Sequence, residues 1–276
     1  MSQSASRSPQ CPDAAHRSPA GPHTLAEVDG WPINIATMRQ AIDEIVAAAH
    51  RGEGFSVVTM NLDHLVKLRR SGPFRRAYAA ARYVTADGAP VAALARLQAS
   101  EVERTTGADL LVPLAQAAAA GGLPVYLFGS TDGVLARAGR DLAQRCDGRL
   151  DIVGSASPSV DFDPESAEAD AAIARIRVSG ARLVLLALGA PKQEIFAARA
   201  VAQGVAAGFV SIGAALDFIA GDQIRAPGIL QRHGMEWAWR LATNPKRLGA
   251  RYAQCALLLA DIAVLAPVKH RLSGTR

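Results

Sequence analysis

The sequence has few cysteines and few aromatic residues. Its three cysteines, Cys11, Cys146 and Cys255, are too far apart for a disulfide framework and do not have the ligand spacing of a zinc site. We therefore expect a reducing compartment, the cytoplasm, and no zinc site built from cysteines. Aromatic residues make up only 5% of the chain, and the basic segments contain no interleaved stacking groups. This composition argues against nucleic acid as a partner.

The C-terminal part also lacks an apolar run long enough to span a bilayer. Its run from Ala256 to Val268 is interrupted by Asp261 and Pro267. The net charge of +5 is concentrated in this part, because residues 222–276 carry nine Lys and Arg against three Asp and Glu. The segment predicts either a helix on an anionic membrane surface or a helix packed on the protein's own core or on another subunit.

The chain has 276 residues, half of them apolar, which is enough for one large α/β domain or two small ones. Residues 1–28 are rich in Ser, Pro, Ala and Gly and lack the apolar h-region of a signal peptide, so we expect a disordered leader. Residues 29–221 are predicted to form an α/β catalytic domain. Residues 222–276 are predicted to form a basic helical C-terminal appendage.

Short apolar runs alternate with Ala-rich segments of helical length. This pattern predicts an α/β fold with a doubly wound, mostly parallel, Rossmann-like sheet. The expected strands are Phe55–Met60, Arg82–Thr85, Val125–Phe128, Asp151–Val153, Leu183–Leu188 and Phe209–Ile212. The expected helices are Ile35–Arg51, Leu62–Ala80, Gly107–Ala120, Gly133–Cys146, Pro164–Ser179 and Pro191–Gln203, with Asp163 as the N-cap of the helix at Pro164.

Polar residues follow several of these strands, at the sheet edge where open α/β folds bind ligands. Thr59 and Asn61 come at the end of the first expected strand, and Asp87 and Gly88 follow the second. Asp87 is a candidate general base if burial raises its pKa, or else a helix cap. Gly88 allows a sharp turn, beside a ligand or simply between elements.

The segment "LVLLALGAPKQE" reads as a buried strand, a turn at Gly189 and a helix with Pro191 in its first turn. Gln193 and Glu194 are then either solvated residues of that turn or groups that face a ligand, and Gly189 is a candidate binding residue at the same turn. Arg104 precedes another expected helix start and suits an anion.

Further candidates lie later in the chain. Asp217 and Arg225 follow the last expected strand, and the basic residues Arg240, Lys246, Arg247 and Arg251 are spaced to line one or two helix faces, as a diphosphate site requires. The alternative is a solvated basic face. Asp161 and Asp163 form a D-x-D pattern that could hold a divalent metal, although Asp163 already suits a cap.

Seven motifs occur in order: "TMNLDH", "ADG", "ERTTGADLL", "LGAPKQE", "IGAALDFIAG", "RAP" and "EWAWRLATNPKRLGARY". Together, over about residues 30 to 255, they resemble the WecG/TagA/CpsF glycosyltransferases, glycosyltransferase family 26. The resemblance implies inverting, metal-independent transfer of a hexose or N-acetylhexosamine, with N-acetylmannosamine as the default, from a UDP-sugar to an undecaprenyl-diphosphate-linked sugar. The expected place is the cytoplasmic face of the cell membrane, in surface polysaccharide synthesis, as a monomer or a homo-oligomer.

The resemblance also implies roles for single residues. Asp87 matches the base, with Thr59 and Asn61 beside it, and Arg104, Gln193 and Asp217 match the nucleotide-sugar pocket. Arg240, Arg247 and Arg251 match an appendage that closes over the active site near the diphosphate. The chain departs from the family pattern at Ala86, where the family has Pro, and in the segment "SASPSVDF".

Two other interpretations remain open from the sequence. One is a nucleotide-sugar epimerase or dehydrogenase, although the turn containing Gly129 and Gly133 is not the G-x-G-x-x-G dinucleotide fingerprint. Such an enzyme would contain a bound nicotinamide, which an absorbance scan detects. The other is a non-catalytic scaffold for lipid-linked intermediates, in which Asp87→Asn would be silent.

Overall fold

The structure is a computed structural model that describes residues 23–265. Its centre is a sheet of six parallel strands in the order β4-β3-β8-β7-β5-β6. The strands are β3 (Phe55–Met60), β4 (Tyr83–Ala86), β5 (Val125–Gly129), β6 (Ile152–Ala156), β7 (Leu183–Ala187) and β8 (Gly208–Ser211). The α/β fold and its parallel, Rossmann-like sheet are therefore confirmed.

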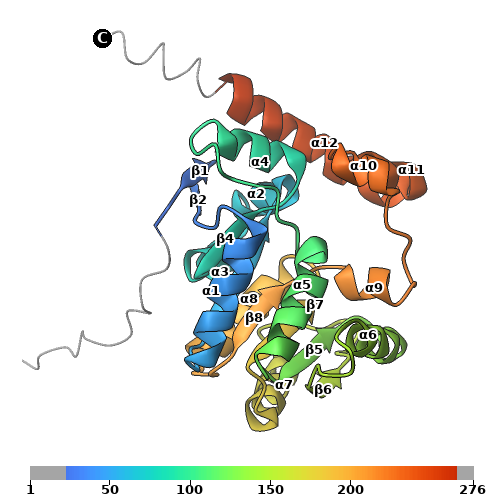
Figure 1. The fold of residues 1–276 in the computed structure, drawn as a ribbon. Coiled ribbons are helices and arrows are strands. Elements are labelled where there is room, and N and C mark those ends of the chain that lie inside the picture. Colours follow the sequence, from blue (N-terminus) through green and yellow to red (C-terminus); the bar gives the residue numbers. More distant parts are fainter. Residues whose placement is uncertain (1–22, 266–276) are drawn as a thin grey trace, which may run out of the picture.

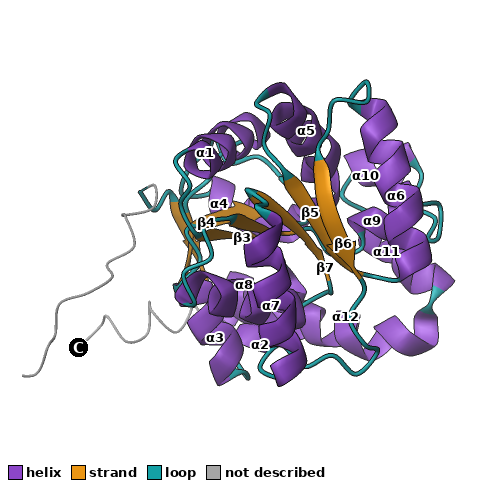
Figure 2. Cartoon of the chain, turned by 90° about the horizontal axis from the view of Figure 1, so that it is seen from below, coloured by secondary structure: helices purple, strands orange, loops and turns teal. Residues whose placement is uncertain are grey.

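Helices cover both faces of the sheet, as Figure 2 shows. On β7, Leu183 and Leu185 pack towards one helical layer and Val184 and Leu186 towards the other. This is why the strand is apolar at every position. The helices are α1 (Met38–His50), α2 (Leu62–Leu68), α3 (Gly72–Ala79), α4 (Ala89–Arg96), α5 (Gly107–Ala120), α6 (Asp132–Arg145), α7 (Ala167–Ser179), α8 (Lys192–Ala202) and α9 (Ala215–Ile219).

Two helix predictions are corrected by the structure. The single helix expected over Leu62–Ala80 is two helices, because Ser71 caps α3 and Pro73 occupies its first turn. The helix expected from Pro164 begins at Ala167 with Ser166 as its N-cap. The Asp163 carboxylate instead accepts a hydrogen bond from the Glu165 backbone N–H at 2.9 Å, so its predicted capping of that helix was wrong.

A short antiparallel hairpin precedes the sheet. It consists of β1 (Ala26–Val28) and β2 (Trp31–Ile33), and Ala26, Val28 and Ile33 are buried in the core beside α2, α3 and α4. The expected leader, residues 1–28, therefore ends within an ordered element. Residues 1–22 lie outside the described part of the chain.

The appendage forms three helices that lie above the carboxyl ends of the strands (Figure 1). They are α10 (Gly228–Arg232), α11 (Glu236–Thr243) and α12 (Pro245–Ala260), and a π-helical turn, Asp261–Leu265, follows α12. Cys255 and Leu258 of α12 are buried in the core cluster around α2, and Asp261 forms an ion pair with Arg69 at 2.7 Å. At least part of α12 therefore packs on the protein's own core. Among residues 23–265, no helix has the length and apolarity needed to cross a membrane.

Candidate active site

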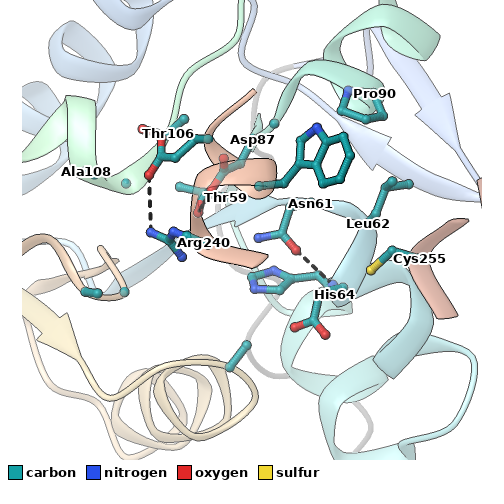
Figure 3. A pocket seen from close by; sticks show the side chains of 18 of the residues that line it. Thr59, Asn61, Leu62, His64, Asp87, Pro90, Thr106, Ala108, Arg240 and Cys255 are labelled. Atoms are coloured by element: carbon teal, nitrogen blue, oxygen red, sulfur yellow. Dashed lines mark hydrogen bonds and ion pairs between the residues drawn. The ribbon is translucent and has the colours of Figure 1, made fainter. Parts of the chain in front are cut away.

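A cavity of about 560 Å³ lies between the carboxyl ends of the strands and the appendage. Loops after β3, β4, β7 and β8 form its floor, and α11 and α12 contribute its cover. Figure 3 shows side chains of both parts facing this space. The predicted site residues that line it are Thr59, Asn61, Asp87, Gly88, Arg104, Gly189, Gln193, Arg240 and Arg251.

Asp87 is held at the end of β4 by the neighbouring strand. Its backbone N–H donates to the Met60 carbonyl oxygen at 2.7 Å, and the Thr59 hydroxyl donates to its carboxylate Oδ2 at 3.3 Å. Gly88 follows with a φ of 82°, a left-handed conformation that suits glycine, and α4 begins directly after it. The parallel pairing of β3 with β4 thus brings Thr59 beside Asp87.

The surroundings of Asp87 raise its pKa from 3.8 to about 7. Burial is the largest cause, and the negative charge of Glu236 acts in the same direction. Arg240, the Thr59 hydrogen bond and Arg104 favour the charged form and partly oppose this effect. A carboxylate with a pKa near 7 can both lose and accept a proton under physiological conditions, as a general base must.

His64 also lines the cavity but is a poorer base. Burial lowers its pKa to about 3, so the imidazole is neutral near pH 7, and its Nδ1 lies 2.5 Å from the Tyr78 hydroxyl oxygen. Asn61 begins α2 as its N-cap, because its side-chain oxygen accepts from the His64 backbone N–H at 3.0 Å (Figure 3).

Arg104 lies in a short loop that is fastened to β4. The Thr105 backbone N–H donates to the Ala86 carbonyl at 2.8 Å, and the Thr85 hydroxyl donates to the Thr105 carbonyl at 2.9 Å. Thr106 then caps α5. This anchoring holds Arg104 at the cavity next to a helix N-terminus, an arrangement that favours an anion.

Each arginine that lines the cavity is paired with a carboxylate. Arg240 lies 3.3 Å from Glu236, and Arg251 lies 2.9 Å from Asp63. Arg104 lies 3.6 Å from Asp109, and Lys67 also pairs with Asp63 at 2.5 Å. An entering diphosphate would therefore compete with these carboxylates for the basic side chains.

Three predicted binding residues are not among those that line the cavity. The carboxylate of Asp217 accepts a hydrogen bond from the Ser130 hydroxyl at 2.9 Å, towards the loop after β5. Arg225 pairs with Asp109 at 2.5 Å and lies 3.9 Å from Glu236, at the side of the site. Arg247 belongs to the first turn of α12, and its side chain is outside the described part of the structure.

The alternative metal pair, Asp161 and Asp163, is exposed in the loop after β6 and does not line the cavity. Within the described ranges, no cluster of three or more His, Cys, Asp or Glu residues could hold a metal ion. Metal independence itself stays a prediction.

Sequence reasoning missed several lining residues. Glu236, Trp237 and Tyr252 come from the appendage, and Asp63 and Lys67 come from α2. All but Lys67 lie within the motifs "EWAWRLATNPKRLGARY" and "TMNLDH", but only the fold of the appendage over α2 shows that they face the cavity. The alternative of Gln193 and Glu194 as solvated residues is wrong, since 3% and 1% of their surfaces are exposed.

A comparison with known protein families identifies the family to which the chain belongs. The model described as "Glycosyl transferase WecG/TagA/CpsF family" matches residues 26–272, most of the chain. The chain belongs to the WecG/TagA/CpsF glycosyltransferase family. It is therefore a transferase of cell-surface polysaccharide synthesis, and the family suggests a nucleotide-sugar donor and a lipid-linked acceptor. The match includes the hairpin β1-β2 and the appendage, so the matched region contains every element that lines the cavity.

Proposed function

We propose that this glycosyltransferase transfers a hexose or N-acetylhexosamine, N-acetylmannosamine by default, from a UDP-sugar to an undecaprenyl-diphosphate-linked sugar, with inversion. The observation that carries the proposal is Asp87, a half-buried carboxylate with a raised pKa, placed in a cavity together with basic side chains. A base and an anion-binding group are the two parts that such a transfer needs.

In the proposed step, Asp87 accepts the proton of an acceptor hydroxyl group. The hydroxyl oxygen attacks the anomeric carbon from the face opposite UDP, and the bond between that carbon and the diphosphate oxygen breaks with its electron pair. Thr59, which donates to the Asp87 carboxylate, keeps the base in one orientation. Asn61 lies beside this pair at the cavity, where its amide can hold the sugar.

The leaving UDP gains negative charge as the bond breaks. Arg104, Arg240 and Arg251 line the same cavity and can stabilise that charge without a metal ion. Because each is already paired with a carboxylate, we propose that the diphosphate takes these side chains from Asp109, Glu236 and Asp63. Arg225, which pairs with Asp109 beside the cavity, and Arg247 stay candidates for the same diphosphate.

We further propose that the protein works at the cytoplasmic face of the cell membrane, where its acceptor is anchored. Five of the exposed large apolar side chains lie between residues 224 and 257, on the appendage and the segment leading to it: Ile224, Ile229, Met235, Trp237 and Leu257. Apolar groups next to basic residues suit the surface of an anionic bilayer.

The proposal is tested by measuring UDP release from a panel of UDP-sugars, with and without a short-chain lipid-diphosphate N-acetylglucosamine acceptor, in the presence of EDTA. We expect release from one donor only when the acceptor is present, with EDTA having no effect. Release that requires added Mn²⁺ or Mg²⁺ would contradict metal independence. A bound nicotinamide in the absorbance spectrum would instead indicate the epimerase or dehydrogenase.

A further inference from the structure

Gln193 and Glu194 form a buried pair at the start of α8. Gln193 lines the cavity, whereas Glu194 lies behind it and is almost completely buried. The Gln193 side-chain Nε2 donates to Glu194 Oε1 at 2.8 Å. The backbone N–H of Gly213, which follows β8, donates to Gln193 Oε1 at 3.3 Å. Both ends of the Gln193 amide are therefore held by the protein.

These two contacts fix which way the amide faces. A backbone N–H can only donate, so the atom opposite Gly213 must be the amide oxygen, and the amide nitrogen must face Glu194. That nitrogen carries two hydrogens, and Glu194 accepts one of them. The second N–H is then the donor of this amide that remains for a ligand in the cavity, whereas the oxygen already accepts from Gly213.

We propose that Glu194 is a positioning residue, which holds Gln193 as a hydrogen-bond donor to an oxygen of the nucleotide sugar. The inference rests on the function proposed above. The recognised oxygen is a phosphate or carbonyl oxygen, because an atom that only accepts matches the N–H donor that Gln193 has left. Without Glu194 the Nε2 end of the amide would lose its protein partner.

Packing alone does not account for a carboxyl group at this position. Burial of such a group is costly, and Glu194 Oε2 has no hydrogen-bond partner among the described residues. Burial also raises the pKa of Glu194 to about 7, while the Gln193 hydrogen bond and Lys67 oppose that rise. In either protonation state an oxygen remains to accept from Gln193, so glutamine is the natural substitute and an apolar residue is not.

The first test compares Glu194→Met, Glu194→Gln and Gln193→Met by titration calorimetry with UDP and with UDP-N-acetylglucosamine. We expect Glu194→Met and Gln193→Met to weaken binding by about 10-fold, the usual effect of losing one hydrogen bond to a ligand. Glu194→Gln should stay within about twofold of the wild type. The double variant Gln193→Met with Glu194→Met should bind no more weakly than either single variant.

A second variant separates positioning from folding. Gln193→Glu combined with Glu194→Gln exchanges the two side chains, so that an amide still donates to a carboxylate and Gly213 still meets an oxygen. We expect thermal unfolding close to that of the wild type but binding about 10-fold weaker, because no N–H then faces the cavity. The carboxylate at residue 193 would also repel the diphosphate, so binding as tight as that of the wild type in the exchanged protein would contradict the inference.

The outcomes distinguish the inference from the proposed function. If the Met variants bind both probes more weakly, Gln193 donates to the nucleotide part. If they bind only UDP-N-acetylglucosamine more weakly, Gln193 donates to the sugar. If the wild type binds the probes and Glu194→Met binds them equally well, the inference is wrong. It is also wrong if Glu194→Gln binds as weakly as Glu194→Met. The proposed function would stand in both cases. A wild-type chain that binds neither probe would contradict the proposed function, and with it the ligand assigned to Gln193.

Discussion

At the scale of single residues, the site depends on carboxyl groups that are partly protected from water. Asp87 is kept uncharged more easily than an ordinary aspartate, and Glu236 contributes to this because its charge opposes ionisation of Asp87. Glu236 is itself held by Arg240 and faces Arg225 at longer distance. The appendage therefore influences the base electrostatically as well as covering it.

This arrangement predicts the pH dependence of transfer. A base must be deprotonated, so kcat/KM should fall as the pH decreases through about 7, the raised pKa of Asp87. In Glu236→Gln the negative charge is removed while Arg240 and Arg104 remain, so the pKa of Asp87 should be lower. The acidic limb of the kcat/KM profile should therefore move to lower pH. The measurement is kcat/KM between pH 5 and pH 9 for both proteins. If the acidic limb of the profile does not move, Glu236 has no influence on the pKa of Asp87.

The raised pKa also predicts a stability change. Because the pKa of folded Asp87 lies above its value of 3.8 in an ordinary setting, the folded state binds more protons, and its stability falls as the pH rises from about 4 to about 7. Asp87→Asn has no ionisable group at this position, so its stability should not decrease in this way as the pH rises. We expect a free energy of unfolding higher by about 1–4 kcal/mol at pH 8 and little change at pH 4, measured by calorimetry. Equal shifts at both pH values would contradict this account.

At the scale of elements, the N-terminus of α5 touches the end of β8. A Cβ atom on Gly107 would lie 2.8 Å from the Ile212 Cα and 2.9 Å from the Ser211 carbonyl oxygen, both of them backbone atoms. Such atoms cannot rotate out of the way. The absence of a side chain at Gly107 therefore allows α5 to place Thr106 and Arg104 at the cavity.

Gly107→Ala should push α5 away from β8. We expect a loss of about 1–3 kcal/mol of stability and a higher KM for the donor, measured by chemical unfolding and steady-state kinetics. Gly139→Ala in α6 is the control, because its Cβ would meet only side-chain atoms at 3.6 and 3.7 Å. The control should be unchanged or more stable by about 0.5–1 kcal/mol. Equal effects in the two variants would contradict the proposed close approach.

The elements also show how far the sequence predicts the fold. The bounds of β3 and α5 agree with the predicted ones, because an apolar run and a capped Ala-rich segment are strong local signals. The hairpin β1-β2 and the helix α4 were not predicted. The two strands have three residues each, too few to show alternation, and α4 follows directly after the turn at Gly88.

At the scale of the whole molecule, the site is assembled from distant parts of the chain. The strand ends that carry Thr59 and Asp87, and the turn after β7 that leads to Gln193, could be predicted, because parallel strands end at one edge. The roles of Glu236 and Tyr252 could not, since they depend on α12 packing against α2 through Cys255 and Leu258. The same packing leaves Leu257 exposed on the other side of α12.

That exposed side predicts how the protein meets a membrane. Leu257→Asp with Ile229→Asp should lower partition onto vesicles containing anionic lipid, since it replaces two apolar contacts by negative charges. Val178→Asp is the control, because Val178 is even more exposed but belongs to α7, at the opposite end of the molecule in Figure 1. Vesicle sedimentation of the three proteins checks this. Equal partition for all of them would contradict membrane contact through the appendage.

The central claim is that Asp87 is the base of a sugar transfer, and it is tested most directly by acceptor-dependent UDP release from wild type and Asp87→Asn. Asp222→Asn is the matched control, because Asp222 is exposed and pairs with Arg137 outside the cavity. We predict a loss of at least about 100-fold for Asp87→Asn, with a normal fold, and full activity for the control. Turnover by Asp87→Asn at the wild-type rate would contradict the account.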